Sequence, residues 1–136
     1  MDYSVYTDGA YSPSINVGGV GFIIIRNDKV VAQFSKAYKG TTNQRMEQLA
    51  VAIALESIKE ADSVQVYSDS AYVVNTYNCG WSRKSNLDLW LRIDKQLKRL
   101  NNVSFHHVKG HSNNEYNEKC DFFAREAVEA YRRRNG

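Results

Sequence analysis

Along the first third of the chain, apolar residues alternate with polar ones, a period of two that is typical of β-strands. The alternation and the β-branched runs predict three strands, over residues 3–8, 18–26 and 29–35. Asn27 and Asp28 supply a turn, so the second and third strands should form a hairpin. In this interpretation Asp8 ends the first strand.

From Thr42 onward, apolar positions recur at three- and four-residue intervals, which is the period of an amphipathic helix. Thr42 or Asn43 can cap its N-terminus, and the apolar stripe continues to Ile58. The rest of the pattern predicts a strand over 63–68, a helix capped by Ser70 that ends near Gly80, a helix over 86–100, a strand over 103–108 and a helix from Asn117 to about Arg132.

This order of elements predicts an α/β fold. Strands that are joined through helices run parallel, so the first strand should pair with the two later ones, while the hairpin lies antiparallel at one side. We therefore expect a mixed five-stranded sheet, three antiparallel strands followed by two parallel ones, flanked by helices. No linker divides the chain, so residues 1–136 should form one domain, with 132–136 as a basic tail.

Four acidic residues stand out against this pattern. Asp8 and Asp69 each follow a strand that should be parallel, and the carboxyl ends of such strands meet at one edge of a sheet. Glu47 and Asp121 lie on the core-facing arcs of their helices, although charged groups are costly there. Each acid alone reads as a cap or a half-exposed side chain, but together they indicate a shared site.

A cation must balance these acids, because no lysine or arginine shares the two helical arcs. Ligands that are all oxygen atoms favour Mg²⁺, with Mn²⁺ as the alternative. Two such ions held by acidic side chains form the arrangement that hydrolyses phosphodiester bonds. The acids therefore predict a nuclease.

The basic residues gather in one part of the chain. The net charge is only +3, yet residues 79–111 carry seven basic side chains against two acidic ones, with Trp81 and Trp90 among them. Such a stretch is either a solvated helix face or a surface that binds a polyanion. Trp90 fits the apolar stripe of its helix and should belong to the core.

Composition narrows the class of protein. A hydrophobic share of 43% with a single proline excludes a disordered or fibrous chain. No apolar run approaches the ~18 residues of a membrane span, and the N-terminus lacks a signal-peptide core. Because Cys79 and Cys120 could form at most one disulfide, a reducing cytoplasm is the expected location.

Four segments, in order along the chain, resemble the motif blocks of type 1 ribonuclease H, in a short form that lacks the basic insertion. They read YTDGA at 6–10, TTNQRMEQLA at 41–50, SDSAYVV at 68–74 and VKGHSNNEYNEKCDFFAR at 108–125. The resemblance implies a ribonuclease H-like fold. It also implies an endonuclease that cuts the RNA strand of RNA/DNA hybrids with two Mg²⁺ ions and leaves 5′-phosphate and 3′-hydroxyl ends.

The resemblance also assigns roles to residues. Asp8, Glu47, Asp69 and Asp121 occupy its metal-binding catalytic positions, and His111 matches a mobile histidine that assists proton transfer or product release. Asn43 and Gln44 are candidates for reading the ribose 2′-hydroxyl, since only RNA carries one. The full set of expected substrate-binding residues is Thr42, Asn43, Gln44, Trp81, Arg83, Lys84 and Lys109.

Other interpretations remain open. Arg132, Arg133 and Arg134 could replace the missing insertion by neutralising phosphates, or they could be a solvated tail. A related two-metal nuclease would act instead on DNA junctions. A catalytically silent module would bind nucleic acid on the same scaffold. We expect a monomer whose partner is an RNA/DNA hybrid, with no membrane association.

Overall fold

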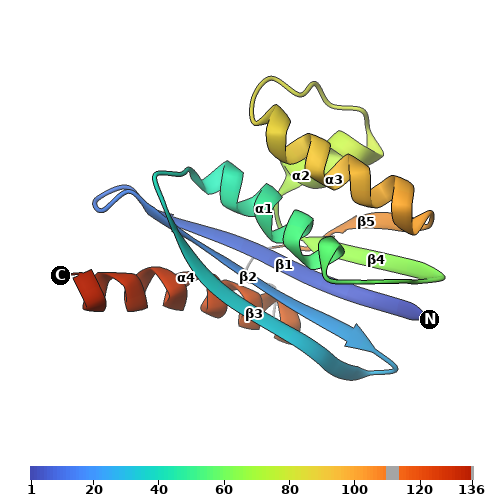
Figure 1. Cartoon of the computed structure of the whole chain (residues 1–136), viewed down its shortest axis with the longest axis horizontal. Helices are drawn as coiled ribbons and strands as arrows, with labels where there is room; N and C mark the ends of the chain where they lie inside the picture. Colours follow the sequence, from blue (N-terminus) through green and yellow to red (C-terminus); the bar gives the residue numbers. More distant parts are fainter. Residues whose placement is uncertain (110–113, 136) are drawn as a thin grey trace.

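The strands and helices expected from the sequence are present in the computed structural model, which describes residues 1–109 and 114–135 (Figure 1). They are, in chain order, β1 (Asp2–Ser12), β2 (Val17–Arg26), β3 (Lys29–Lys39), α1 (Asn43–Glu56), β4 (Ser63–Ser68), α2 (Ala71–Asn78), α3 (Leu87–Leu100), β5 (Val103–His107) and α4 (Glu115–Asn135).

The five strands form one mixed sheet in the order β3-β2-β1-β4-β5. β1 and β3 both pair antiparallel with β2, whereas β4 pairs parallel with both β1 and β5. The predicted α/β class and strand arrangement are therefore confirmed. Because β1 lies at the centre of the sheet and has a parallel and an antiparallel neighbour, it is the strand on which the two halves meet.

Several boundaries differ from the expectation: β3 continues to Lys39 and α4 begins at Glu115, and two further differences affect the site and the expected tail. β1 does not end at Asp8, because its antiparallel pairing with β2 continues to Ser12 opposite Val17. Only its parallel pairing with β4 stops there, at Thr7 opposite Ser68. At the other end of the chain, the arginines expected in a tail at 132–134 continue α4, where Arg133 pairs with Glu126 at 2.6 Å. Basic side chains also suit the negative end of a helix dipole.

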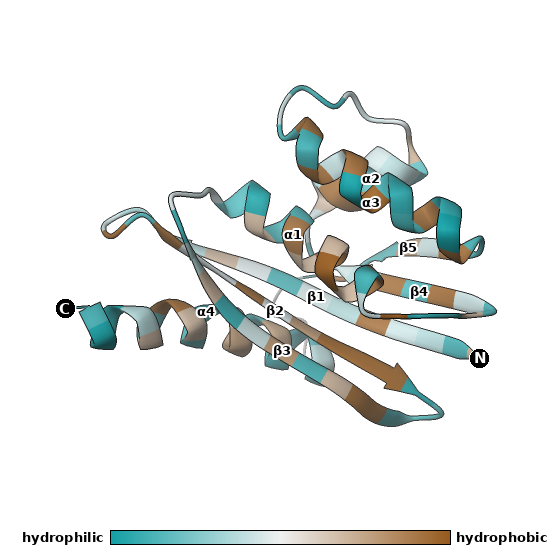
Figure 2. Ribbon diagram, in the orientation of Figure 1, coloured by the Kyte–Doolittle hydropathy of each residue, from teal (hydrophilic) through white to brown (hydrophobic). Residues whose placement is uncertain are grey.

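Helices cover both faces of the sheet. α1, α2 and α3 lie on one face, and α4 crosses the other, against β1, β2 and β3 (Figure 1). β2 is apolar along most of its length because both of its faces are covered (Figure 2). The main core lies between the sheet and α1 to α3, and it includes the fully buried Val5, Leu55 and Val66. Trp90 of α3 is also fully buried, as its apolar stripe predicted.

Glycines let helices approach the sheet closely. A side chain at Gly21 of β2 would lie 2.5 Å from the carbonyl oxygen of Cys120 in α4, closer than real side-chain carbons come. The close packing fixes α4 at the residue that precedes Asp121. Close approach of backbone is a general use of glycine.

Candidate active site

Two carboxylates lie side by side where the parallel half of the sheet ends. β1 and β4 pair up to Thr7 and Ser68, so Asp8 and Asp69 are the next residues on neighbouring strands. Asp8 is only 4% exposed, and Asp69 is half-buried. The expected meeting of these two acids at one sheet edge is observed, although Asp8 stands within a strand rather than at its end.

Glu47 reaches the same place from α1. It is 6% exposed, and its Oε1 atom accepts a 2.5 Å hydrogen bond from the backbone N–H of Gly9. A side chain at position 9 would lie 2.6 Å from the backbone nitrogen of Glu47, so only glycine lets α1 come this close to β1. Oδ1 of Asp8 accepts from the same N–H at 2.8 Å.

These three acids form one cluster. Asp8, Glu47 and Asp69 each offer a carboxylate oxygen, and the three oxygens lie within 4.8 Å of one another. Among the described residues, those that line the surrounding hollow of about 360 Å³ include no lysine or arginine. Within this described lining, no basic side chain neutralises the negative charge of the cluster.

Mutual repulsion and burial change how the cluster titrates. Burial raises the pKa of the Asp8 carboxyl from its ordinary value of 3.8 to about 7, and the negative charge of Asp69 contributes in the same direction. Burial also raises the pKa of Glu47 well above its ordinary range, with repulsion from Asp8 as the second cause. Such shifts in a hollow are typical of functional sites, and a bound cation would reverse them.

Asp121 lines the same hollow but is not part of the cluster of three. Its Oδ2 atom accepts a 3.0 Å hydrogen bond from Nε of Arg125, one turn further along α4. The sequence-based expectation that no basic residue pairs with this acid is therefore wrong. The physical reason is the four-residue spacing, which brings an aspartate and an arginine together on one helix face.

A second hollow adjoins the hollow of the cluster. Gln44 and Tyr72 line both, and the second hollow, of about 450 Å³, extends to Trp81 and Lys84. Trp81 is 48% exposed, unlike the buried Trp90. We refer to these two adjoining hollows together as the groove.

The other expected substrate-binding residues are distributed as follows. Asn43 lines the hollow of the acids, and Thr42 caps α1, its Oγ1 accepting from the backbone N–H of Arg45 at 3.1 Å. Arg83 belongs to the loop beside the groove but pairs with Asp94. Lys109 is exposed after β5, and His111 lies outside the described residues.

Three residues that line the acid hollow were not predicted from the sequence. Gly9 and Ser70 each follow one of the aspartates, and Tyr72 lies three residues after Asp69, in the first turn of α2. The spacing would not have identified Tyr72, because Asp69 precedes the N-cap of α2 and the two residues do not share a helix face.

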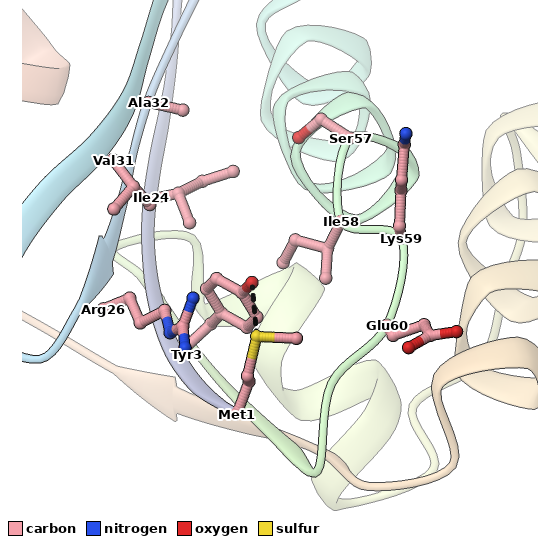
Figure 3. Close-up of a pocket in the computed structure, with 10 residues that line it drawn as sticks. All are labelled: Met1, Tyr3, Ile24, Arg26, Val31, Ala32, Ser57, Ile58, Lys59 and Glu60. Atoms are coloured by element: carbon pink, nitrogen blue, oxygen red, sulfur yellow. Dashed lines mark hydrogen bonds between the residues drawn. The ribbon is translucent and has the colours of Figure 1, made fainter.

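A further hollow of about 560 Å³ lies between β1, β2, β3 and the end of α1 (Figure 3). Apolar side chains such as Tyr3, Ile24 and Ile58 line most of it, and Glu60 is its only carboxylate among the described residues. Its described lining therefore does not repeat the acid cluster of the first hollow.

Comparison with known proteins agrees with this geometry. The family model described as RNase H matches residues 1–129. The chain belongs to the RNase H family. As a member it is an enzyme, an endonuclease of the hydrolase class. Among curated proteins, ribonuclease H of Prosthecochloris aestuarii is 43% identical, covering 91% of this chain and 93% of the relative. Ribonuclease H of Chlorobaculum parvum is 42% identical, covering 92% and 94%.

Solved structures share the fold. The N-terminal RNase H domain of Rv2228c from Mycobacterium tuberculosis matches with a TM-score of 0.85 at 19% identity, covering 99% of each chain. LC11-RNase H1, solved in complex with an RNA/DNA hybrid, matches with a TM-score of 0.83 at 23% identity, covering 95% of this chain and 98% of that one. No helix within residues 1–109 and 114–135 is long and apolar enough to span a membrane.

Proposed function

We propose that this member of the RNase H family hydrolyses the RNA strand of RNA/DNA hybrids at the acid cluster, leaving 5′-phosphate and 3′-hydroxyl ends. The observation that carries the proposal is the set of three carboxylate oxygens within 4.8 Å of one another. Two of the three side chains are almost fully buried, in a hollow whose described lining includes no basic residue. Cations favour the charged form of such a set, because the carboxylates repel one another and burial disfavours their charge.

The donor set fits a hard divalent ion, and we assign Mg²⁺ to it, with Mn²⁺ as the alternative. All donors are carboxylate oxygens, which are the ligands that these ions prefer. Asp8, Glu47 and Asp69 would hold the metal, and Asp121 would join them. When bound, a pair of such ions stabilises negative charge on phosphate oxygens and lowers the pKa of water.

The chain's own residues would orient the substrate along the groove. Asn43 and Gln44 carry amides that both donate and accept, so they can read the ribose 2′-hydroxyl. Trp81 and Lys84, at the far end of the groove, offer a ring to a sugar or base and a charge to a phosphate. The hybrid bound by LC11-RNase H1, a structural neighbour, supports this choice of substrate.

Three other expectations stay predictions. His111 would assist proton transfer or product release, because an imidazole titrates near neutral pH. Lys109 would neutralise a phosphate. The chain would act as a monomer in the cytoplasm.

The test is a cleavage assay on a hybrid with each strand labelled in turn, with Mg²⁺ and with chelator. We expect cuts in the RNA strand only, and only with the metal. Asp69→Asn removes one charge from the cluster without changing its shape, and we expect it to abolish cleavage. Asp28→Asn is the matched control, because Asp28 is an exposed turn residue with a positive φ that asparagine also adopts.

Two alternatives give different results in the same assay. A nuclease of DNA junctions would cut an all-DNA junction and leave the hybrid intact. A silent binding module would retain the hybrid on a gel without cutting it. Either result would contradict the proposal.

A further inference from the structure

The segment between α2 and α3 carries the far end of the groove. Residues 79–86 have no regular secondary structure, yet Trp81, Ser82 and Lys84 all line the groove. Trp81 and Lys84 are exposed. A segment of this kind needs side-chain contacts to hold one conformation, because loop backbone loses entropy when it is fixed.

Arg83 turns away from the groove and supplies the strongest of these contacts. Its two terminal nitrogens donate to the two carboxylate oxygens of Asp94 on α3, at 2.6 and 3.0 Å. Its guanidinium carbon lies 5.3 Å from the ring centre of Tyr77 and 5.4 Å from that of Trp90. The hydroxyl of Tyr77 donates to Asp94 at 3.0 Å. Arg83 and Asp94 line a separate hollow, together with Tyr77 and residues of α3, and Arg83 is not among the residues that line the groove.

The other contacts of the loop are single hydrogen bonds, and those at its two ends include Cys79 to Asn75 at 2.8 Å and Asn86 to Gln48 and Arg45 at 2.9 and 3.2 Å. The backbone N–H of Trp81 donates to the carbonyl oxygen of Asn75 at 3.4 Å, and the hydroxyl of Tyr72 donates to the carbonyl oxygen of Ser82 at the same distance. The indole N–H of Trp90 donates to the carbonyl of Ser85 at 3.1 Å. A two-point bond between an arginine and a carboxylate is stronger than any of these, because both partners are charged.

We propose that Arg83 and Asp94 are positioning residues, which hold Trp81 and Lys84 against the substrate groove without contacting the nucleic acid themselves. This inference rests on the proposed function, since it concerns the same groove. It also revises the expectation that Arg83 binds substrate directly. Substrate binds more tightly to a loop that is already ordered, because no free energy is then spent on ordering the loop during binding.

The first test compares Arg83→Ala with Asp94→Asn in steady-state cleavage of an RNA/DNA hybrid. Both remove the same pair, so both should raise KM about tenfold, which corresponds to about 1.4 kcal/mol, and leave kcat unchanged. If Arg83 instead touched a phosphate, Asp94→Asn would free its guanidinium and leave KM equal or lower. That result would overturn the proposal. Arg83→Lys, which keeps the charge but not the two-point bond, should recover only part of the affinity.

The second test asks whether Arg83 acts through its neighbours. In a Trp81→Ala/Lys84→Ala background, adding Arg83→Ala should change KM by less than about twofold, because the loop no longer carries the contacts that Arg83 positions. A full additional tenfold increase would show a direct contact and contradict the proposal.

Glu56→Gln is the matched control. It breaks another two-point pair, in which Arg92 of α3 donates to Glu56 of α1 at 3.0 and 2.7 Å, away from the groove. We expect it to lower the melting temperature while leaving KM unchanged. If Arg83→Ala behaves in the same way, its role is only structural and the positioning role is refuted. Failure of the proposed function is distinguishable, because the unmodified protein would then not cut the hybrid at all.

Discussion

Asp8→Asn should make the metal-free protein more stable while it removes activity. Asparagine has the same shape as aspartate, and its Oδ1 atom can still accept from the N–H of Gly9 as Asp8 does. The substitution therefore removes a buried negative charge beside Glu47 and Asp69 with little change in packing. It separates the charge of the cluster from its geometry.

The size and sign of the change in the free energy of unfolding follow from the pKa of Asp8. Burial and the neighbouring Asp69 raise it from 3.8 to about 7, so the folded state holds this proton over a pH range in which the unfolded chain releases it. Stability therefore falls as pH rises from about 4 to 7 and is constant above. Three pKa units correspond to about 4 kcal/mol, and relaxation around the site reduces the expected cost to about 2–4 kcal/mol at pH 8.

The assay is denaturant unfolding in chelator at pH 4 and at pH 8. We expect the two proteins to be about equally stable at pH 4 and Asp8→Asn to be more stable by about 2–4 kcal/mol at pH 8. Adding Mg²⁺ at pH 8 should stabilise the unmodified protein more than the variant, because ions that bind the folded state shift the equilibrium toward it. Hybrid cleavage by the variant should fall at least about a hundredfold.

Asp28→Asn is again the control, because it neutralises an exposed aspartate in a turn. It should leave the pH dependence of unfolding unchanged. Equal stability of Asp8→Asn and the unmodified protein at pH 8 in chelator would refute the claim that Asp8 carries an unbalanced charge.

Three other substitutions test further parts of the structure. Gly9→Ala should destabilise the fold by about 1–3 kcal/mol and lower kcat, because the new carbon would lie 2.6 Å from the backbone nitrogen of Glu47; unfolding and cleavage assays check this. Trp90→Ala should cost about 3–5 kcal/mol of the free energy of unfolding, since the ring is fully buried. Arg125→Gln should lower the half-saturating Mg²⁺ concentration in cleavage up to about fivefold, because it releases Asp121 from an exposed ion pair.

Much of the site was predictable, because strand ends fix where the aspartates lie and the helical period fixes which face of its helix Glu47 occupies. Asp8 and Asp69 were placed together by the rule that parallel strands end at one edge, and the structure brings them there. Glu47 was placed inward by the three- and four-residue period of its helix, and it is buried. These predictions depend on backbone conformation, which the period of apolar residues along the sequence indicates reliably.

Side-chain pairing was less predictable. The sequence placed Asp121 on an inward margin of its helix, but its pairing with Arg125 depends on rotamers that the period does not set. Likewise, the basic composition of residues 79–111 was compatible with a solvated helix face or with a polyanion surface, and it did not indicate that Arg83 pairs with Asp94 and lines a separate hollow. In a loop without regular structure, the sequence carries no periodicity from which to assign sides.

Apolar packing around α1 offsets the repulsion between the carboxylates of the cluster. Glu47 stands on α1, whose other residues include the fully buried Ala50, Val51 and Leu55, and burial of such apolar groups stabilises the fold by about 1–3 kcal/mol for each large side chain. The helix is therefore held against β1 whether or not the carboxylates repel one another. Because this packing is independent of the charges, the site can remain assembled without metal. Chelator should then lower stability and remove activity without unfolding the protein, and a loss of far-ultraviolet circular dichroism in chelator at neutral pH would contradict this reasoning.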